Sequence, residues 1–374
     1  MTERAPTPPS QRIELIDILR GFALFGVLLV NMQYFASPPY AVFLEASSAE
    51  LPDWLGFWFV RLFAESKFYP LFSFLFGYGM AMQMRNAQLR EQPFAGLYAW
   101  RLFLLLLFGG YHSLLWSGDI LATYALLGLI LLPFRERSDA ALITFAVACL
   151  FGASAVLALI QLGVLPAALS EQARGVFERI ESGDRQAIRQ ALRAMSMFCF
   201  GLCAGRRQLL TGGWASSRRV QRLMLWGWIV GFPGNLAYLV MRENAVEAEL
   251  TWAWIAAITL LAWSGPLLAA GYAATLLKLF DIPRWRRRLA ALAPVGRTAL
   301  TNYVLQTLVC KALMSGHVLG HFAPIRPPLG VLLSVVIFAA QIGVSRYWLR
   351  RYRFGPLEWL WRSLTYARRQ PFRV

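Results

Sequence analysis

The chain has 374 residues, of which 57% are hydrophobic and only 15% are charged, and its formal net charge is +17. Soluble domains carry roughly 45–50% apolar and about 25% charged residues, so this composition excludes an ordinary soluble protein. The four cysteines are too few in so long an apolar chain to form a disulfide framework. The composition therefore predicts an all-α, polytopic integral membrane protein.

Ten windows of the chain are apolar enough to be membrane-spanning helices, each of which needs about 20 mostly apolar residues. We expect them at 15–36, 68–84, 98–117, 119–134, 140–165, 191–209, 220–241, 251–277, 296–316 and 329–349. Only Ser117-Gly118-Asp119 separates the third window from the fourth, which predicts a tight helical hairpin. The segment 53–67 alternates aromatic with charged residues, and we interpret it as an interfacial amphipathic helix.

The charged residues between these windows predict the orientation of the chain. Ten spans put both ends on one side, and the Lys and Arg residues gather in the segments on that side, whereas acidic residues lean to the other. This positive-inside pattern predicts an N-in/C-in topology. We expect a disordered cytoplasmic tail at 1–11, a transmembrane domain at 12–350 and a basic interfacial tail at 351–374. Topology and the lipid bilayer as partner explain the basic excess, so no nucleic-acid partner is expected. The first apolar run is also too long for a cleaved signal.

Polar residues in the first window form a stripe on one helix face. Asp17 and Arg20 are i,i+3 neighbours, and Asn31 follows eleven residues after Arg20, about 1100° of helical turn and within roughly 20° of the same face. Ionisable residues inside a membrane are costly and often functional. The alternative is a structural ion pair at the start of the helix.

His112 is the most suggestive side chain of the third window, and the predicted hairpin brings Asp119 close behind it, with Tyr124 nearby. A neutral imidazole in a dry site can take a proton from an alcohol or amine, and a carboxylate can fix its tautomer. The alternative is a histidine that is simply hydrogen-bonded between helices.

Three further polar features stand at helix positions. Lys67, at the start of the second window, either snorkels to the interface or faces a ligand. Asn302 and Gln306, i,i+4 on the ninth window, either join helices or line a cavity. His317 and His321 have the spacing of a metal pair but no evident third ligand, so no metal is predicted.

Five blocks of this sequence, in this order, resemble the YeiB family of bacterial inner-membrane proteins, and together the blocks are spread over nearly the whole chain. They are RIELIDILRGFALFGVLLVN, KFYPLFSFLFGYGM, HSLLWSGDILATYALLG, GRTALTNYVLQT and RFGPLEWLWRSLTY. That family is more distantly similar to transmembrane acyltransferases such as heparan-α-glucosaminide N-acetyltransferase. The shared pattern stands here as Asp17-x-x-Arg20-Gly21, Asn31 and His112.

The resemblance implies a multi-pass protein of the bacterial inner membrane that moves an acyl group from acetyl-CoA or another acyl-CoA to a small-molecule or glycan acceptor at the outer face. His112, with Asp119 behind it, would be catalytic. The residues expected to bind donor or acceptor are Asp17, Arg20, Asn31, Lys67, Tyr124, Asn302 and Gln306. This hypothesis requires a cleft that joins Arg20 to His112, and a homo-oligomer is compatible with it.

Two alternatives stay open. A transporter or lipid-handling protein without covalent chemistry could use the same polar stripe, with Pro233 marking a broken seventh helix. A purely structural or sensing role is the third.

Overall fold

The computed structural model of the protein describes residues 14–36, 50–162, 185–210, 217–244, 251–314 and 325–374. The predicted tail at 1–11 and the His317/His321 pair lie outside these residues. The described part of the chain is almost entirely helical, and its β structure is limited to one isolated bridge between Tyr352 and Arg373. The prediction of an all-α chain is therefore confirmed for the described residues.

Each predicted window is helical over most of the residues that the structure describes. The bounds of the helices are α1 Glu14–Ala36, α3 Leu51–Phe63, α4 Phe68–Leu89, α5 Ala95–Leu115, α6 Leu121–Leu131, α7 Asp139–Gln161, α9 Arg185–Arg206, α10 Arg218–Trp226, α11 Phe232–Asn244, α12 Trp252–Phe280, α13 Pro283–Leu289, α14 Ala293–Arg297, α15 Ala299–Met314, α16 Pro327–Leu349 and α17 Pro356–Thr365.

Four helical segments of the described chain are long and apolar enough to cross a membrane by length and composition: Glu14–Phe35, Arg218–Arg242, Trp252–Phe280 and Pro327–Leu349. The shorter apolar helices include α6, whose 11 residues are well below the roughly 20 residues of a span. Four described helices thus qualify as candidate spans, fewer than the ten windows predicted.

The helix containing Pro233 continues through that residue. A π-helical turn at Gly227–Gly231 joins α10 to α11 just before it, and the Asn235 side-chain amide donates to the Gly231 carbonyl at 2.7 Å. Proline has no backbone N–H, so upstream carbonyls need other partners, and a π turn is one common adjustment. The seventh window is therefore a continuous helical segment with one π-helical turn, and it is not interrupted at Pro233.

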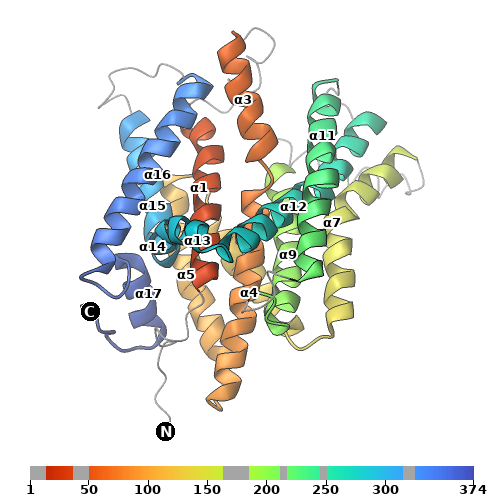
Figure 1. Ribbon diagram of the computed structural model, residues 1–374. Coiled ribbons are helices and arrows are strands. Elements are labelled where there is room, and N and C mark those ends of the chain that lie inside the picture. Colours follow the sequence, from red (N-terminus) through yellow and green to blue (C-terminus); the bar gives the residue numbers. More distant parts are fainter. Residues whose placement is uncertain (1–13, 37–49, 163–184, 211–216, 245–250, 315–324) are drawn as a thin grey trace.

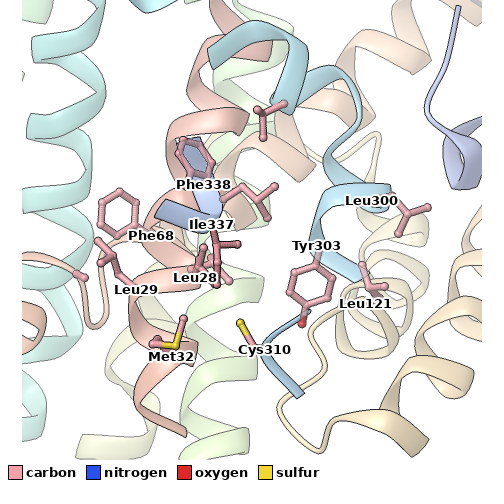
Figure 2. Packing of buried hydrophobic residues seen from close by; sticks show 14 of the residues in the cluster. Leu28, Leu29, Met32, Phe68, Leu121, Leu300, Tyr303, Cys310, Ile337 and Phe338 are labelled. Atoms are coloured by element: carbon pink, nitrogen blue, oxygen red, sulfur yellow. The ribbon is translucent and has the colours of Figure 1, made fainter. Parts of the chain in front are cut away.

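Most helices run side by side, α12 and α13 cross the others obliquely, and α3 and α17 lie at opposite ends of the bundle (Figure 1). We call these the α3 end and the α17 end. Helix α1 lies centrally, and its apolar residues pack with α15 and α16 in the core that Figure 2 shows. Two glycines let α1 touch α14 and the short helical turn before it backbone to backbone, because a Cβ on Gly21 would collide with the Leu292 carbonyl and one on Gly296 with the Asp17 carbonyl.

This close approach brings Arg20 of α1 and Arg297 of α14 to the same side of the bundle. A second close contact, between α4 and α9, has Gly77 of α4 against the backbone of Phe198. On another side of α4, Gly79 lies next to the guanidinium of Arg20, since a Cβ on Gly79 would be 3.5 Å from Arg20 Nη2.

Candidate functional site

A cavity of about 1140 Å³, counting its open mouth, runs into the bundle between α1, α4, α5, α15 and α17. We call it the arginine cavity, because four guanidinium groups line it, those of Arg20, Arg101, Arg297 and Arg362. Glu358 is the only carboxylate among the lining residues that the structure describes. The cavity is therefore basic where α17 borders it.

The deeper part of the arginine cavity is apolar. Leu24 and Val27 of α1 face Leu105 of α5 and Leu121 of α6 across it. From Arg20 to Val27 the cavity follows α1 for about 10 Å, at 1.5 Å per residue. A ligand that fits this shape has an anionic head and an apolar arm.

Two of the arginines are held by aromatic rings of the C-terminal segment. The guanidinium of Arg101 lies 4.0 Å from the centre of the Trp361 ring, whose indole N–H donates to the Arg101 carbonyl at 3.0 Å. Arg362 stacks on Phe354 at 4.8 Å. Such stacking fixes a planar guanidinium in one orientation.

Glu358 is buried beside the arginine cavity and is bound to α15. Its two carboxylate oxygens accept from the Thr301 backbone N–H at 3.0 Å and from the Thr301 hydroxyl at 2.6 Å. Burial raises the pKa of Glu358 above the ordinary glutamate value, although the two bonds from Thr301 act in the opposite direction. The pair ties α17 to α15 at the cavity wall.

Tyrosines close the inner end of the arginine cavity. The Tyr124 hydroxyl lies 2.6 Å from Ser73 Oγ and 3.2 Å from the Tyr69 carbonyl. Tyr303 of α15 accepts at its hydroxyl from the Ile120 N–H at 3.3 Å, and Figure 2 shows its ring near Leu121. Tyr124 and Tyr303 both line the cavity, and we call the two side chains the tyrosine partition.

His112 lies directly behind this partition and is buried between a carboxylate and a hydroxyl. Its Nδ1 is 2.7 Å from Asp119 Oδ1, and its Nε2 is 2.9 Å from Thr307 Oγ1. The side chains of His112 and Asp119 are 1% and 2% exposed. An ionised carboxylate can only accept, so the network assigns the ring proton to Nδ1 and makes Nε2 the acceptor for Thr307.

Asp119 also begins helix α6, because its second oxygen, Oδ2, accepts the Ala122 N–H at 2.8 Å. Helix initiation by an aspartate is common, and here the same carboxylate orients an imidazole. The resulting Asp119–His112–Thr307 line has the donor order of a hydroxyl activated by a histidine that a carboxylate orients. The expected pairing of His112 with Asp119 is thus present.

The expectation of one open cleft from Arg20 to His112 is wrong for this structure. Arg20 lines the arginine cavity, but His112 does not, and the Tyr303 ring stands between them, with its centre 5.0 Å from the imidazole centre. The physical reason is packing: α15 fills the gap between α1 and the α5–α6 hairpin with an aromatic side chain. Movement of Tyr303 would join the two parts.

The polar stripe of α1 is only partly at the cavity. Arg20 is bound to Asp17 at 3.4 Å, and the Arg20 side chain is 34% exposed. Asn31 is half-buried further along α1 and does not line the arginine cavity. Of the predicted stripe, Arg20 reaches the cavity directly and Asp17 lies beside it.

Lys67 neither snorkels nor joins the arginine cavity. It is 1% exposed, and its ammonium donates to the Arg61 carbonyl at 2.9 Å. The neighbouring Phe68 ring packs on Gly26, in the middle of α1, so this turn lies deep in the bundle. The Arg61 carbonyl and the charge of Arg193 lie close to it.

Asn302 and Gln306 join α15 to α16. The Asn302 amide donates to Ser345 Oγ at 2.9 Å, and the Gln306 amide donates to Gln341 Oε1 at 2.9 Å. The Gln341 amide returns a bond to the Asn302 carbonyl at 3.0 Å. Neither Asn302 nor Gln306 lines the arginine cavity, so in this structure they connect helices and do not contact it.

Several residues of the site escaped the sequence reasoning: Thr307, Tyr303, Arg101, Arg297, Arg362 and Glu358. Tyr303 and Thr307 are one turn apart on α15, on the face next to Asn302 and Gln306. Their i,i+4 spacing, the second such pair on that helix, was the signal that could have identified them. The arginines were indistinguishable from ordinary cytoplasmic charges. Glu358 stood out only as an acidic residue in a basic tail.

Comparisons with known proteins agree over nearly the whole chain. A family model described as "Protein of unknown function (DUF418)" matches residues 204–368. The uncharacterized protein YxaH of Bacillus subtilis is 32% identical, with 99% of this chain and 98% of the relative covered. The uncharacterized protein YeiB of Escherichia coli is 32% identical over 95% of this chain and 96% of its own. An uncharacterized 39.9 kDa protein from the amylase 3' region of Bacillus acidopullulyticus is 31% identical over 98% and 97%.

Proposed function

The chain belongs to the family of YeiB and YxaH, and from that premise we propose that it is a membrane-bound acyltransferase that uses acetyl-CoA or another acyl-CoA as donor. The observation that carries the proposal is the arginine cavity, whose inner end is one side chain, Tyr303, away from the Asp119–His112–Thr307 line. A basic mouth, an apolar passage and a histidine held by a carboxylate are the parts that such a reaction requires.

The proposed donor fits the cavity by its chemistry. Arginine forks bind phosphate oxygens in pairs, and the phosphates of a CoA thioester would contact Arg297 and Arg362 at the mouth. The flexible arm would follow the apolar wall of Leu24 and Val27, so the thioester would reach the tyrosine partition. Arg20, oriented by Asp17, would contact polar atoms of that arm.

The proposed reaction uses His112 as a general base. When Tyr303 turns aside, an acceptor hydroxyl takes the position of the Thr307 hydroxyl at Nε2 and gives its proton to the imidazole as its oxygen attacks the thioester carbonyl carbon. The carbon–sulfur bond breaks, and the leaving thiolate takes the proton from the imidazolium. The products are an ester of the acceptor and the CoA thiol, and Asp119 stabilises the transient positive ring.

We also propose the number of spans and the orientation of the chain in the membrane. Ten spans with both ends inside would put the α17 end, and with it the mouth of the arginine cavity, at the cytoplasmic face of the bacterial inner membrane. Support comes from the Lys and Arg excess in the segments at that face and from the supply of acyl-CoA, which is a cytoplasmic metabolite. The acceptor would then arrive from the α3 end.

One observation favours a second candidate function. Both nitrogens of His112 are already bonded, and the histidine does not line the cavity. A protein that binds or moves an anionic lipid, without covalent chemistry, would need only the basic mouth and the apolar passage. In this alternative, replacing an arginine of the mouth weakens ligand binding, as it does for the enzyme. Replacing His112 has no effect, because no chemical step depends on it.

The test uses the purified full chain in nanodiscs. Binding of acetyl-CoA and release of the CoA thiol, with water as the acyl acceptor, are measured for the wild type, His112→Ala and, as a matched control, the exposed α13 variant Arg287→Gln. We expect acetyl-CoA binding in all three and a thiol release that His112→Ala lowers by about 10²–10⁴-fold. Equal thiol release by wild type and His112→Ala removes His112 from the mechanism. Absence of acetyl-CoA binding by the wild type rejects the donor assignment.

A further inference from the structure

A second, smaller pocket adjoins the arginine cavity at the α17 end. It has a volume of about 560 Å³, counting its open mouth. Its walls are the last turns of α4, the turn at 90–94, the first turns of α5 and the end of α17 (Figure 1). We call it the turn pocket. Gln83, Tyr98 and Arg101 line both the turn pocket and the arginine cavity, so the two spaces meet at these three side chains.

Aromatic rings and side-chain amides make up much of the wall of the turn pocket. Phe94 and Tyr98, one helical turn apart, stack with their ring centres 4.8 Å apart and their planes 24° from parallel. Asn86 of α4 and Gln92 of the turn add amide groups to the wall. Aromatic side chains stack on nucleobases, and an amide can match the neighbouring donor and acceptor on the edge of an adenine. The turn pocket therefore has the lining that a planar heterocycle requires.

The Tyr98 hydroxyl is the observation that points to a ligand. Tyr98 is 3% exposed, and its hydroxyl oxygen is buried without a hydrogen-bond partner among the residues that the structure describes. Such a hydroxyl costs stability, because it has lost its bonds to water and has gained none in exchange. Tyr98 and Tyr366 both lie within electrostatic range of the Arg101 guanidinium, where the two spaces meet. A bound molecule that offers a donor or an acceptor at this point would recover the cost.

Helix α5 carries the features of the two spaces in order along the chain. Phe94, at its start, lines the turn pocket, Arg101 lines both spaces, and Leu105 lines the apolar part of the arginine cavity. The distance along the helix from Phe94 to Leu105 is about 16 Å, at 1.5 Å per residue. Trp361 of α17 holds the Arg101 guanidinium between them, at 4.0 Å from its ring centre. A molecule with phosphates at the arginines can therefore extend one way into the turn pocket and the other way along the apolar wall.

We propose that the turn pocket binds the adenine base of the acyl donor, so that the protein selects a thioester that carries a nucleotide over the same thioester on phosphopantetheine alone. The inference rests on the proposed function, because it takes a CoA thioester as the donor. In that molecule the base and the flexible arm lie on opposite sides of the pyrophosphate, which is the order found along α5. The base stacks beside Phe94, and its edge forms a hydrogen bond with the Tyr98 hydroxyl.

The experiment measures the binding of two donors to the full chain in nanodiscs by calorimetry. The donors are acetyl-CoA and S-acetyl-phosphopantetheine, which has the thioester arm and a phosphate but no nucleoside. The variants are Tyr98→Phe, which removes the unpartnered hydroxyl, and Phe94→Leu, which removes the stacking ring. The matched control is Tyr111→Phe, which removes a hydroxyl from the same helix at a residue that is 70% exposed and lines neither space.

We expect the wild type to bind acetyl-CoA more tightly than S-acetyl-phosphopantetheine by about tenfold or more. Tyr98→Phe and Phe94→Leu each weaken acetyl-CoA binding by about fivefold to tenfold and leave the binding of S-acetyl-phosphopantetheine unchanged. Tyr111→Phe changes neither. Because the Tyr98 hydroxyl has no partner to lose, Tyr98→Phe unfolds at the wild-type temperature or above it, so its weaker binding is not a failure to fold.

Two kinds of failure are distinguishable. The adenine assignment alone is overturned if the wild type binds the two donors equally, or if either variant leaves acetyl-CoA binding unchanged or weakens both donors equally. In those cases the proposed acyl transfer stands. If the wild type binds neither donor, the proposed function fails together with the adenine assignment.

Discussion

His112 accepts a 2.9 Å hydrogen bond at Nε2 from the hydroxyl of Thr307, which lies 195 residues further along the chain. The bond joins the α5–α6 hairpin to α15, and it completes a line that begins at Asp119. Both side chains are 1% exposed, so neither has water as an alternative partner. The same contact can stabilise the fold and prepare a proton acceptor, and the two roles have different consequences on mutation.

Thr307→Val removes the hydroxyl and keeps the shape of the side chain. The Nε2 acceptor of His112 is then buried without its partner, so we expect the free energy of unfolding to fall by about 1–2 kcal/mol. Thermal unfolding in detergent measures the change. The control is Thr259→Val, whose hydroxyl bonds only to the Ile255 carbonyl of its own helix. An equal effect of the two variants would show that the bond between the helices adds nothing.

Asp119→Asn tests the orientation of the imidazole. The amide can still accept from the Ala122 N–H, so the start of α6 is kept, but it no longer favours a proton on Nδ1. We expect stability near that of the wild type and thiol release from acetyl-CoA reduced by a factor on the order of 10²–10⁴. Retained thiol release with a correctly folded protein would contradict the role proposed for Asp119.

Arg297→Gln tests the mouth of the arginine cavity. Arg297 is exposed at the end of α14, so its replacement leaves the core unchanged. We expect acetyl-CoA to bind about tenfold more weakly, because one charge-assisted contact to phosphate is lost. Arg287→Gln removes an equally exposed arginine that does not line the cavity and is expected to have no effect. Binding to the wild type is also expected to weaken as salt rises.

Glu358 predicts a pH dependence of stability. Because burial raises its pKa in the folded protein, the folded state holds the proton more tightly than the unfolded state does. Stability therefore falls as pH rises from the ordinary glutamate pKa through the raised one, and it is constant above both values. Glu358→Gln, which does not titrate, is expected to flatten this part of the curve of thermal midpoint against pH. An unchanged slope would assign the dependence to another group.

Gly77→Ala tests the contact between α4 and α9. A Cβ at this position would collide with the backbone of Phe198, which cannot give way as a flexible side chain can, so we expect a loss of about 1–3 kcal/mol. Gly110 of α5 is the matched control, since a Cβ there has nothing within 4 Å. Gly110→Ala is expected to unfold at the wild-type temperature or slightly above it.

The local relationships of the site were accessible from sequence. Asp17 and Arg20 are one helical turn apart, and the short connection Ser117-Gly118-Asp119 folds the carboxylate back on His112, so helix periodicity and a tight turn were sufficient. The same reasoning could not tell whether Asn302 and Gln306 face a cavity or another helix. That choice depends on the rotation of α15 against α16, which nothing local determines.

By itself, the sequence determined the helical class of the chain, the presence of apolar helices that are candidates to span a membrane, and its membership of a family, because composition, periodicity and the order of motifs are properties of consecutive residues. Only the tertiary structure decided that Thr307 meets His112, that Tyr303 separates that histidine from the cavity of Arg20, and that Lys67 is buried among arginines. Each of these contacts joins segments far apart in the chain. They are decided by how closely whole helices approach, and glycines such as Gly21, Gly77 and Gly296 set those approaches where backbone meets backbone.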